Sequence, residues 1–303
     1  MARRARRLLN RLLAAGALTS LTLLVQPQAA KALVPYVYIP RPQEIEGAGL
    51  GIAQAASRLL RLGQAADAAR LAALTVQLLP DDPRGWLLLA EAQLRSNQGK
   101  AASESLARAK QLDPRNAGIW FAEGSLALRN GDPKDAISLL QQGLRFDNRN
   151  AGAYFDLGNA QLLVGNPRDA IRDWERAASL REGFWEAINN QGLVLFELGD
   201  RNAAVTRWRR ALQIRPDAAE PSLALAAGLL AQGEQHRREA IELASRSLAA
   251  DPNYVLETYQ KEQLWGDKLR AATQRLLMLQ ELKATVERAH ANASPESQTE
   301  EDL

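Results

Sequence analysis

Side chains that could carry out catalysis or bind a metal are few in this sequence of 303 residues, and they are scattered. The chain has no cysteine, which excludes disulfides, thiolate nucleophiles and zinc sites built from cysteine. Its two histidines stand far apart, His236 in an expected turn and His290 at the start of the expected tail. Paired acids such as Asp81-Asp82 fall in expected turns, where carboxylates cap helices. We therefore predict no enzyme, no cofactor and no metal centre.

A polar sequence motif that could be mistaken for a binding site occurs twice, as NGDPKDAI over residues 130–137 and VGNPRDAI over residues 164–171. The interval of 34 residues between them also relates four columns of residues along the chain. The columns are Gly63, Asn97, Gly131, Gly165, Gly199 and Gly233; Ala68, Ala102, Ala136, Ala170 and Ala204; Trp86, Trp120 and Tyr154; and Pro80, Pro114, Pro216 and Pro252, the last of which is displaced by two residues. Four columns at one period indicate a repeat protein.

Each column suits a pair of helices joined by a turn. The glycine can adopt the left-handed conformation that ends a first helix. Asp132 and Asn166 then stand where a side-chain oxygen caps the next helix, and Pro133 and Pro167 suit its first turn. The column alanine lets the two helices approach closely, and the last proline ends the second helix. The glycines therefore need no phosphate-binding role, and the repeat predicts helical hairpins that bury their apolar faces against each other.

This pattern resembles the tetratricopeptide repeat (TPR) family, which places an aromatic residue at position four of each unit, small residues at eight and twenty, and proline at thirty-two. Residues 49–254 divide into six such units, which start at Gly49, Pro83, Ala117, Ala151, Trp185 and Ala219. The resemblance implies an all-α, right-handed α-solenoid of helix-turn-helix units. It also implies that Trp174 and Trp208, at position twenty-four, are core residues.

The residues after the sixth unit keep a helical pattern without the repeat. Residues 255–265 predict a short helix and residues 267–289 a long one, with Leu269, Leu276 and Val286 on one side. Capping helices of this kind cover the exposed apolar end of a solenoid, and a dedicated binding helix is the alternative.

The resemblance also implies where a partner would bind, because the first helix of each unit builds the concave surface of a TPR solenoid. The partner-binding groove is assigned to ten residues: Arg61, Leu87, Glu91, Arg95, Phe121, Ser125, Arg129, Phe155, Asn159 and Asn189. Leu87, Phe121 and Phe155 form an apolar row beside a basic row, which suits an extended or helical peptide that carries acids. The alternative is that the aromatic residues complete packing within the units and the arginines are merely solvated.

The first 32 residues predict export from the cytoplasm. They hold six basic residues and no acid, an apolar run at residues 12–25 and the small-residue pattern Ala30-Lys31-Ala32, as a signal peptide does. An uncleaved membrane anchor is the alternative. Of the 38 basic and 35 acidic residues in the chain, 32 and 35 remain beyond this segment, so a nucleic-acid partner is not expected. Residues 33–48 predict an extended leader, and residues 290–303 a disordered acidic tail.

Two further segments, GAGLGIAQ at the start of the array and QKEQLWGDKLRAA after it, resemble exported cyanobacterial TPR proteins of the periplasm or thylakoid lumen. That resemblance implies a role in the assembly or stability of a membrane complex, with a photosystem as one candidate. The function we expect is a scaffold that binds a protein or peptide in its groove. The alternative is a membrane-anchored organiser that acts through self-association; the oligomeric state stays open.

Overall fold

The regular structure of the protein is helical, with no strand among the residues that the computed structural model describes, 40–294. The predicted signal peptide, most of the leader and the end of the acidic tail lie outside these residues. Within them, no helix combines the length and apolarity needed to cross a membrane.

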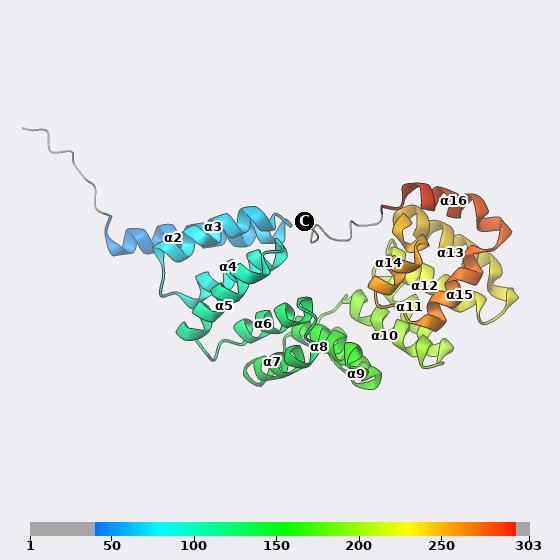
Figure 1. The fold of residues 1–303 in the computed structure, drawn as a ribbon, viewed down its shortest axis with the longest axis horizontal. Helices are drawn as coiled ribbons and strands as arrows, with labels where there is room; N and C mark the ends of the chain where they lie inside the picture. The colour runs from blue at the N-terminus through cyan, green and yellow to red at the C-terminus, as the bar shows by residue number, and fades with distance from the viewer. Residues whose placement is uncertain (1–39, 295–303) are drawn as a thin grey trace, which may run out of the picture. The chain divides into compact units, whose positions relative to one another are not determined.

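Twelve helices form six consecutive hairpins, which follow one another along the chain in Figure 1. They are α2 (Pro42–Arg61), α3 (Ala65–Leu78), α4 (Pro83–Arg95), α5 (Gly99–Leu112), α6 (Ala117–Arg129), α7 (Pro133–Phe146), α8 (Ala151–Leu163), α9 (Pro167–Leu180), α10 (Trp185–Glu197), α11 (Arg201–Ile214), α12 (Ala219–Leu230) and α13 (Arg237–Ala250). From the second unit on, the first helix begins at the residue that the 34-residue period marks. The predicted all-α solenoid of helix pairs is confirmed.

The first helices of successive units contact one another directly. These contacts join α2 to α4, α4 to α6, α6 to α8, and α10 to α12. From the first unit to the fifth, each second helix packs against its own first helix and against the first helix of the next unit. We call the surface formed by α2, α4, α6, α8, α10 and α12 the inner face.

Helix ends follow the predicted turns, with one difference. The column glycines have positive φ, such as 79° at Gly131, and Asn97 takes the same conformation at 60°. Asp132 and Asn166, however, make no side-chain cap. Asp132 has φ −108° and ψ 66°, outside the extended region of a capping residue, and its backbone N–H donates to the Ala127 carbonyl at 2.9 Å. The predicted caps are therefore wrong: the glycine closes the turn through the backbone.

Within a hairpin, a small residue of the first helix lies against a large residue of the second. A Cβ at Gly158 would lie 2.5 Å from Nε1 of Trp174, and a Cβ at Gly192 would lie 2.5 Å from Nε1 of Trp208. Both tryptophans are fully buried, as predicted. The column alanines at residues 68, 102, 136, 170 and 204 are fully buried as well.

Two segment boundaries differ from those predicted. The sequence predicts an extended leader over residues 33–48, but α2 begins at Pro42. Pro42 suits a first helical turn, and Glu44 complements the helix dipole there. At the other end, the expected disordered tail begins later than residue 290, because the last helix continues to Asn292.

The predicted long helix over residues 267–289 is broken in two. After η2 (Pro252–Val255) and α14 (Glu257–Glu262), the chain forms α15 (Asp267–Leu277), η3 (Gln280–Leu282) and α16 (Lys283–Asn292). An unbroken helix over residues 267–289 would be about 35 Å long, at roughly 1.5 Å per residue. The helix α13, which contacts both α15 and α16, is only about 21 Å long by the same measure. Leu276 and Leu282, on either side of the break, are both fully buried.

The contact between Gly158 and Trp174 makes a testable prediction. Gly158→Ala forces the indole to move, and we expect the free energy of unfolding to fall by about 1–3 kcal/mol through overpacking. The control is Gly51→Ala in α2, where no atom lies within 4 Å of the new Cβ and helix propensity favours alanine. Urea unfolding followed by circular dichroism measures both. Equal stability of the two variants would contradict the packing described.

Candidate functional site

A groove crosses α4, α6 and α8 on the inner face and holds a cavity of about 550 Å³. Six of the ten predicted groove residues line it: Leu87, Glu91, Arg95, Phe121, Ser125 and Arg129. Asp156 and Arg181 also line it, and the sequence did not point to them. Asp156 stands at position six of its unit, whereas the ten predicted residues stand at positions five, nine and thirteen, and Arg181 follows α9 at the end of the same unit. We call this cavity the open groove.

The floor of the open groove is apolar, and its large side chains Leu87 and Phe121 pack against glycines of α6 and α7. A Cβ at Gly118 would lie 2.9 Å from Leu87, and one at Gly143 would lie 2.5 Å from the Phe121 ring. Leu87 and Phe121 remain partly exposed. Apolar contact area is thus available at the base of the groove.

Charged groups stand beside this floor. Arg95 pairs with Glu91 at 2.7 Å, with both side chains about half exposed. Arg129 donates from Nη1 to the Leu94 carbonyl at 2.6 Å. Asp156 accepts a hydrogen bond from the Ser125 hydroxyl at 2.5 Å. Burial raises the pKa of Asp156, while the Ser125 hydrogen bond and the Arg129 charge act in the opposite direction.

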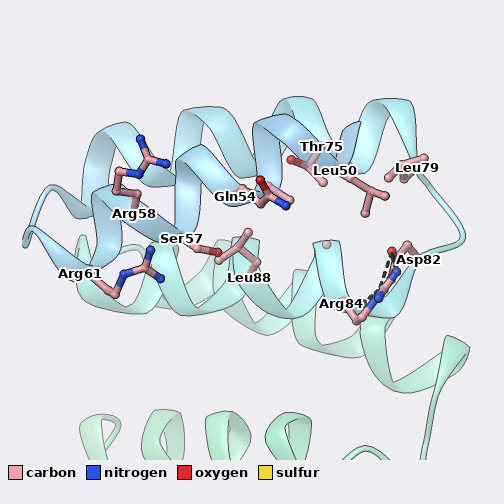
Figure 2. Close-up of a pocket in the computed structure, with 12 residues that line it drawn as sticks. Leu50, Gln54, Ser57, Arg58, Arg61, Thr75, Leu79, Asp82, Arg84 and Leu88 are labelled. Carbon is pink, nitrogen blue, oxygen red and sulfur yellow. Dashed lines mark hydrogen bonds and ion pairs between the residues drawn. The ribbon is translucent and has the colours of Figure 1, made fainter. Parts of the chain in front are cut away.

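A second cavity of about 500 Å³ lies between α2, α3 and α4, and Arg61 lines this one (Figure 2). Arg58 and Arg61 stand toward one end and the Arg84–Asp82 pair, 2.7 Å apart, toward the other. The hydrogen bond from Arg84 holds the pKa of Asp82 below its usual value. The predicted basic row is thus divided between two neighbouring cavities, with Arg61 in this one and Arg95 and Arg129 in the open groove.

Phe155, Asn159 and Asn189 lie outside both cavities and take part in packing. The Phe155 ring lies 5.0 Å from that of Phe184, between centroids. Asn159 Oδ1 accepts from Trp174 Nε1 at 3.2 Å. Asn189 is fully buried. These three residues of the predicted groove are therefore not brought together with the six that line the open groove.

The inner face of the last two units is covered by the chain itself, because α15 packs against α12 and α10. Glu197, at position thirteen of the fifth unit, caps α15: its carboxylate accepts from the backbone N–H of Lys268 at 3.2 Å and of Leu269 at 2.8 Å. A carboxylate at a helix N-terminus pairs with free amides and with the helix dipole. Contact is so close that a Cβ at Gly266 would overlap the Glu197 side chain.

Glu220 of α12 accepts a hydrogen bond from the loop before α15. Its carboxylate accepts from Trp265 Nε1 and from Asn189 Nδ2, each at 2.9 Å. Burial raises the pKa of Glu220 to about 7, and these two hydrogen bonds oppose the rise. Asn189 Oδ1 is a buried acceptor without a hydrogen-bond partner.

Apolar burial makes α15 a fixed part of this face. Trp265, just before α15, and Leu269 and Leu276, within it, are buried, each at 2% exposure or less. At about 1.5–3 kcal/mol for each large side chain, exposing all three would cost roughly 5–9 kcal/mol, comparable to the whole stability of many domains. The inner face is therefore open over units one to four and closed over units five and six.

An array of helical hairpins with this packing is the fold of a TPR solenoid. Residues 121–183 match the sequence profile of the tetratricopeptide repeat family. A comparison with curated proteins returned no sequence match.

Several solved structures share the fold. The APC/C hetero-tetramer Cut9-Hcn1 aligns with TM-score 0.63 and 17% identity over 76% of this chain. TTC0263, a thermophilic TPR protein of Thermus thermophilus, aligns with TM-score 0.53 and 21% identity over 60% of this chain and 99% of its own. PilF of Pseudomonas aeruginosa aligns with TM-score 0.51 and 16% identity over 82% and 99%. This chain spans only 43% of the Cut9-Hcn1 chain that it matches.

Among residues 40–294, histidine, aspartate and glutamate side chains form no group of three that could hold a metal ion. His236 lies in the short helix η1 (Glu234–His236) before α13, and His290 lies in α16. The two imidazoles thus belong to different elements and to neither cavity.

The raised pKa of Glu220 predicts how stability depends on pH. Its folded value of about 7 lies above the ordinary 4.5, so the folded state holds the proton more tightly. The associated stability is complete below about pH 4.5 and is lost as pH rises through about 7, at up to roughly 1 kcal/mol per pH unit. Glu220→Gln should flatten this fall.

Urea unfolding between pH 5 and pH 8 measures the effect. Asp173, whose pKa burial raises to about 6, contributes a fall of the same sign and remains in the variant. The variant should therefore keep part of the slope and be more stable than the parent at pH 8. A slope identical to that of the parent would refute the assignment to Glu220.

Proposed function

We propose that the protein is a non-enzymatic scaffold that holds a protein or peptide partner in the open groove. The observation that carries this proposal is the contrast along the inner face. Units five and six are filled by α15, whereas the apolar floor at Leu87 and Phe121 has no covering segment among residues 40–294. Grooves with an apolar floor and a polar rim are how helical scaffolds bind extended or helical segments.

Charge favours a partner that carries carboxylates. The two cavities of the open inner face are lined by six guanidinium groups and three carboxylates: Arg58, Arg61, Arg84, Arg95, Arg129 and Arg181, against Asp82, Glu91 and Asp156. The chain beyond residue 32 has the opposite balance, with 32 basic and 35 acidic residues out of totals of 38 and 35. A basic surface on an otherwise slightly acidic chain favours an acidic segment and disfavours basic ones.

The setting of this scaffold is a further part of the proposal. The arginine-rich start and the apolar run at residues 12–25 support export to a periplasm or thylakoid lumen, where the protein would aid the assembly or stability of a membrane complex. The alternative is a membrane-anchored organiser that self-associates. N-terminal sequencing of the native protein separates them, since a start at Leu33 fits export with cleavage and a retained segment fits the anchor.

Reversing charge in the open groove tests the binding proposal. Arg95→Glu with Arg129→Glu should weaken binding of an acidic partner by at least tenfold, because each charge-assisted hydrogen bond contributes about 1.5–3 kcal/mol and about 1.4 kcal/mol is a factor of ten. The partner is captured from native membranes on the immobilised parent protein, identified by mass spectrometry, purified and titrated against each variant.

The matched control is Arg210→Glu on α11, a second helix whose exposed arginine lines neither cavity. Helical circular dichroism should be the same for all variants. Binding that survives the double reversal, or that Arg210→Glu weakens equally, would place the partner elsewhere than in the open groove.

A further inference from the structure

A smaller cavity of about 260 Å³ lies where units four and five meet. Its walls are mainly apolar and come from α8, α9, α10 and the loop before α15; they include Leu162, Pro167, Leu193, Val194, Leu198 and Leu264. Glu197 also borders it, but its carboxylate is committed to the amides of α15. We call this cavity the socket.

Large apolar side chains at and beside the socket are unusually exposed. Leu198 is 50% exposed and Leu264 is 38% exposed, and Leu163, the residue after Leu162 in α8, is 50% exposed. Single exposed leucines are ordinary on a protein surface. Several around one apolar cavity are typical of a surface that binds another molecule.

The backbone holds Leu264 outward in a strained conformation. Its φ is 65°, a left-handed value that residues with a Cβ rarely adopt. The neighbouring Trp265 is held at two points. Its indole N–H donates to Glu220, and its backbone N–H donates to the Gln260 carbonyl at 3.0 Å. Gln260 is itself fully buried and donates to the Tyr254 carbonyl at 2.7 Å. The turn thus presents an apolar side chain at the rim of the socket.

One register of the repeat has residues at both the open groove and the socket. Position thirteen, at or near the C-terminal end of each first helix, reads Arg61, Arg95, Arg129, Leu163 and Glu197 over units one to five. The row is therefore basic over three units and apolar over the fourth. In the fifth it is acidic and already used by α15. A segment that lies along this row meets guanidinium groups first and the socket last.

We propose that the socket anchors a large apolar side chain of the same partner that the open groove binds. The partner segment then carries carboxylates over units one to three and a leucine-like or aromatic residue at the junction of units four and five. This rests on the proposed function and names the partner's chemistry. Packed helices lie about 8–10 Å apart, so the last carboxylate and the anchor are separated by roughly 10–20 Å, or about seven to thirteen residues of a helix.

Selection from a phage-displayed library of random 20-residue peptides on the immobilised full chain tests this chemistry. We expect enriched peptides to carry aspartate or glutamate in one part and leucine, phenylalanine or tryptophan in the other. Synthetic copies are then titrated against the parent and against Leu264→Asn, because asparagine tolerates a left-handed φ and removes only the apolar side chain. A second variant, Leu198→Ser, removes apolar surface from a helix end instead of that turn.

Each socket variant should weaken peptide binding about tenfold, and Leu74→Ser, which alters a leucine of α3 that is 45% exposed and lines none of the three cavities, should leave it unchanged. Thermal unfolding verifies that the variants are folded. Peptides that need Arg129 but bind Leu264→Asn and Leu198→Ser as well as the parent would overturn the socket and leave the proposed function standing. Failure to enrich any peptide that depends on Arg129 would count against both.

Discussion

The contact between a small residue on the first helix of a hairpin and a large residue on its second helix sets the distance on which the rest of the solenoid depends. Gly158 against Trp174 and Gly192 against Trp208 leave no room for a single added carbon. Because this contact fixes each hairpin, the hairpins stack in one register and their first helices meet along one face. Residues committed to this packing cannot vary without loss of stability.

Residues at positions five, nine and thirteen do not make that contact, so their side chains can differ between units and give each stretch of the inner face its own chemistry. Position thirteen shows how far this goes. Arg95 and Arg129 line a groove that the described chain leaves open, whereas Glu197 caps the helix with which the chain covers its own fifth and sixth units. Residues at position thirteen thus carry opposite charges in different units. Their distribution along the chain decides where a partner has room.

Much of this fold was predictable because each repeated residue meets a local requirement. The 34-residue period predicted the first-helix starts from the second unit on, and the column glycines predicted the left-handed turns. The closure of units five and six was not predictable, since the bond from Leu269 to Glu197 joins residues 72 apart in sequence. The same closure buries Asn189, which position alone had assigned to the groove. Asp156 was missed because its neighbours Ser125 and Arg129 come from the preceding unit.

Hydrogen exchange of the protein with and without its captured partner tests the central claim most directly, because it reports on every unit at once. Partner binding in the open groove, with its anchor in the socket, predicts slower amide exchange in α4, α6 and α8 and at the C-terminal end of α10, with no change in α12 or α15. Protection of α10 and α12 together with faster exchange in α15 would mean that the partner displaces the chain's own helix, and would contradict the account.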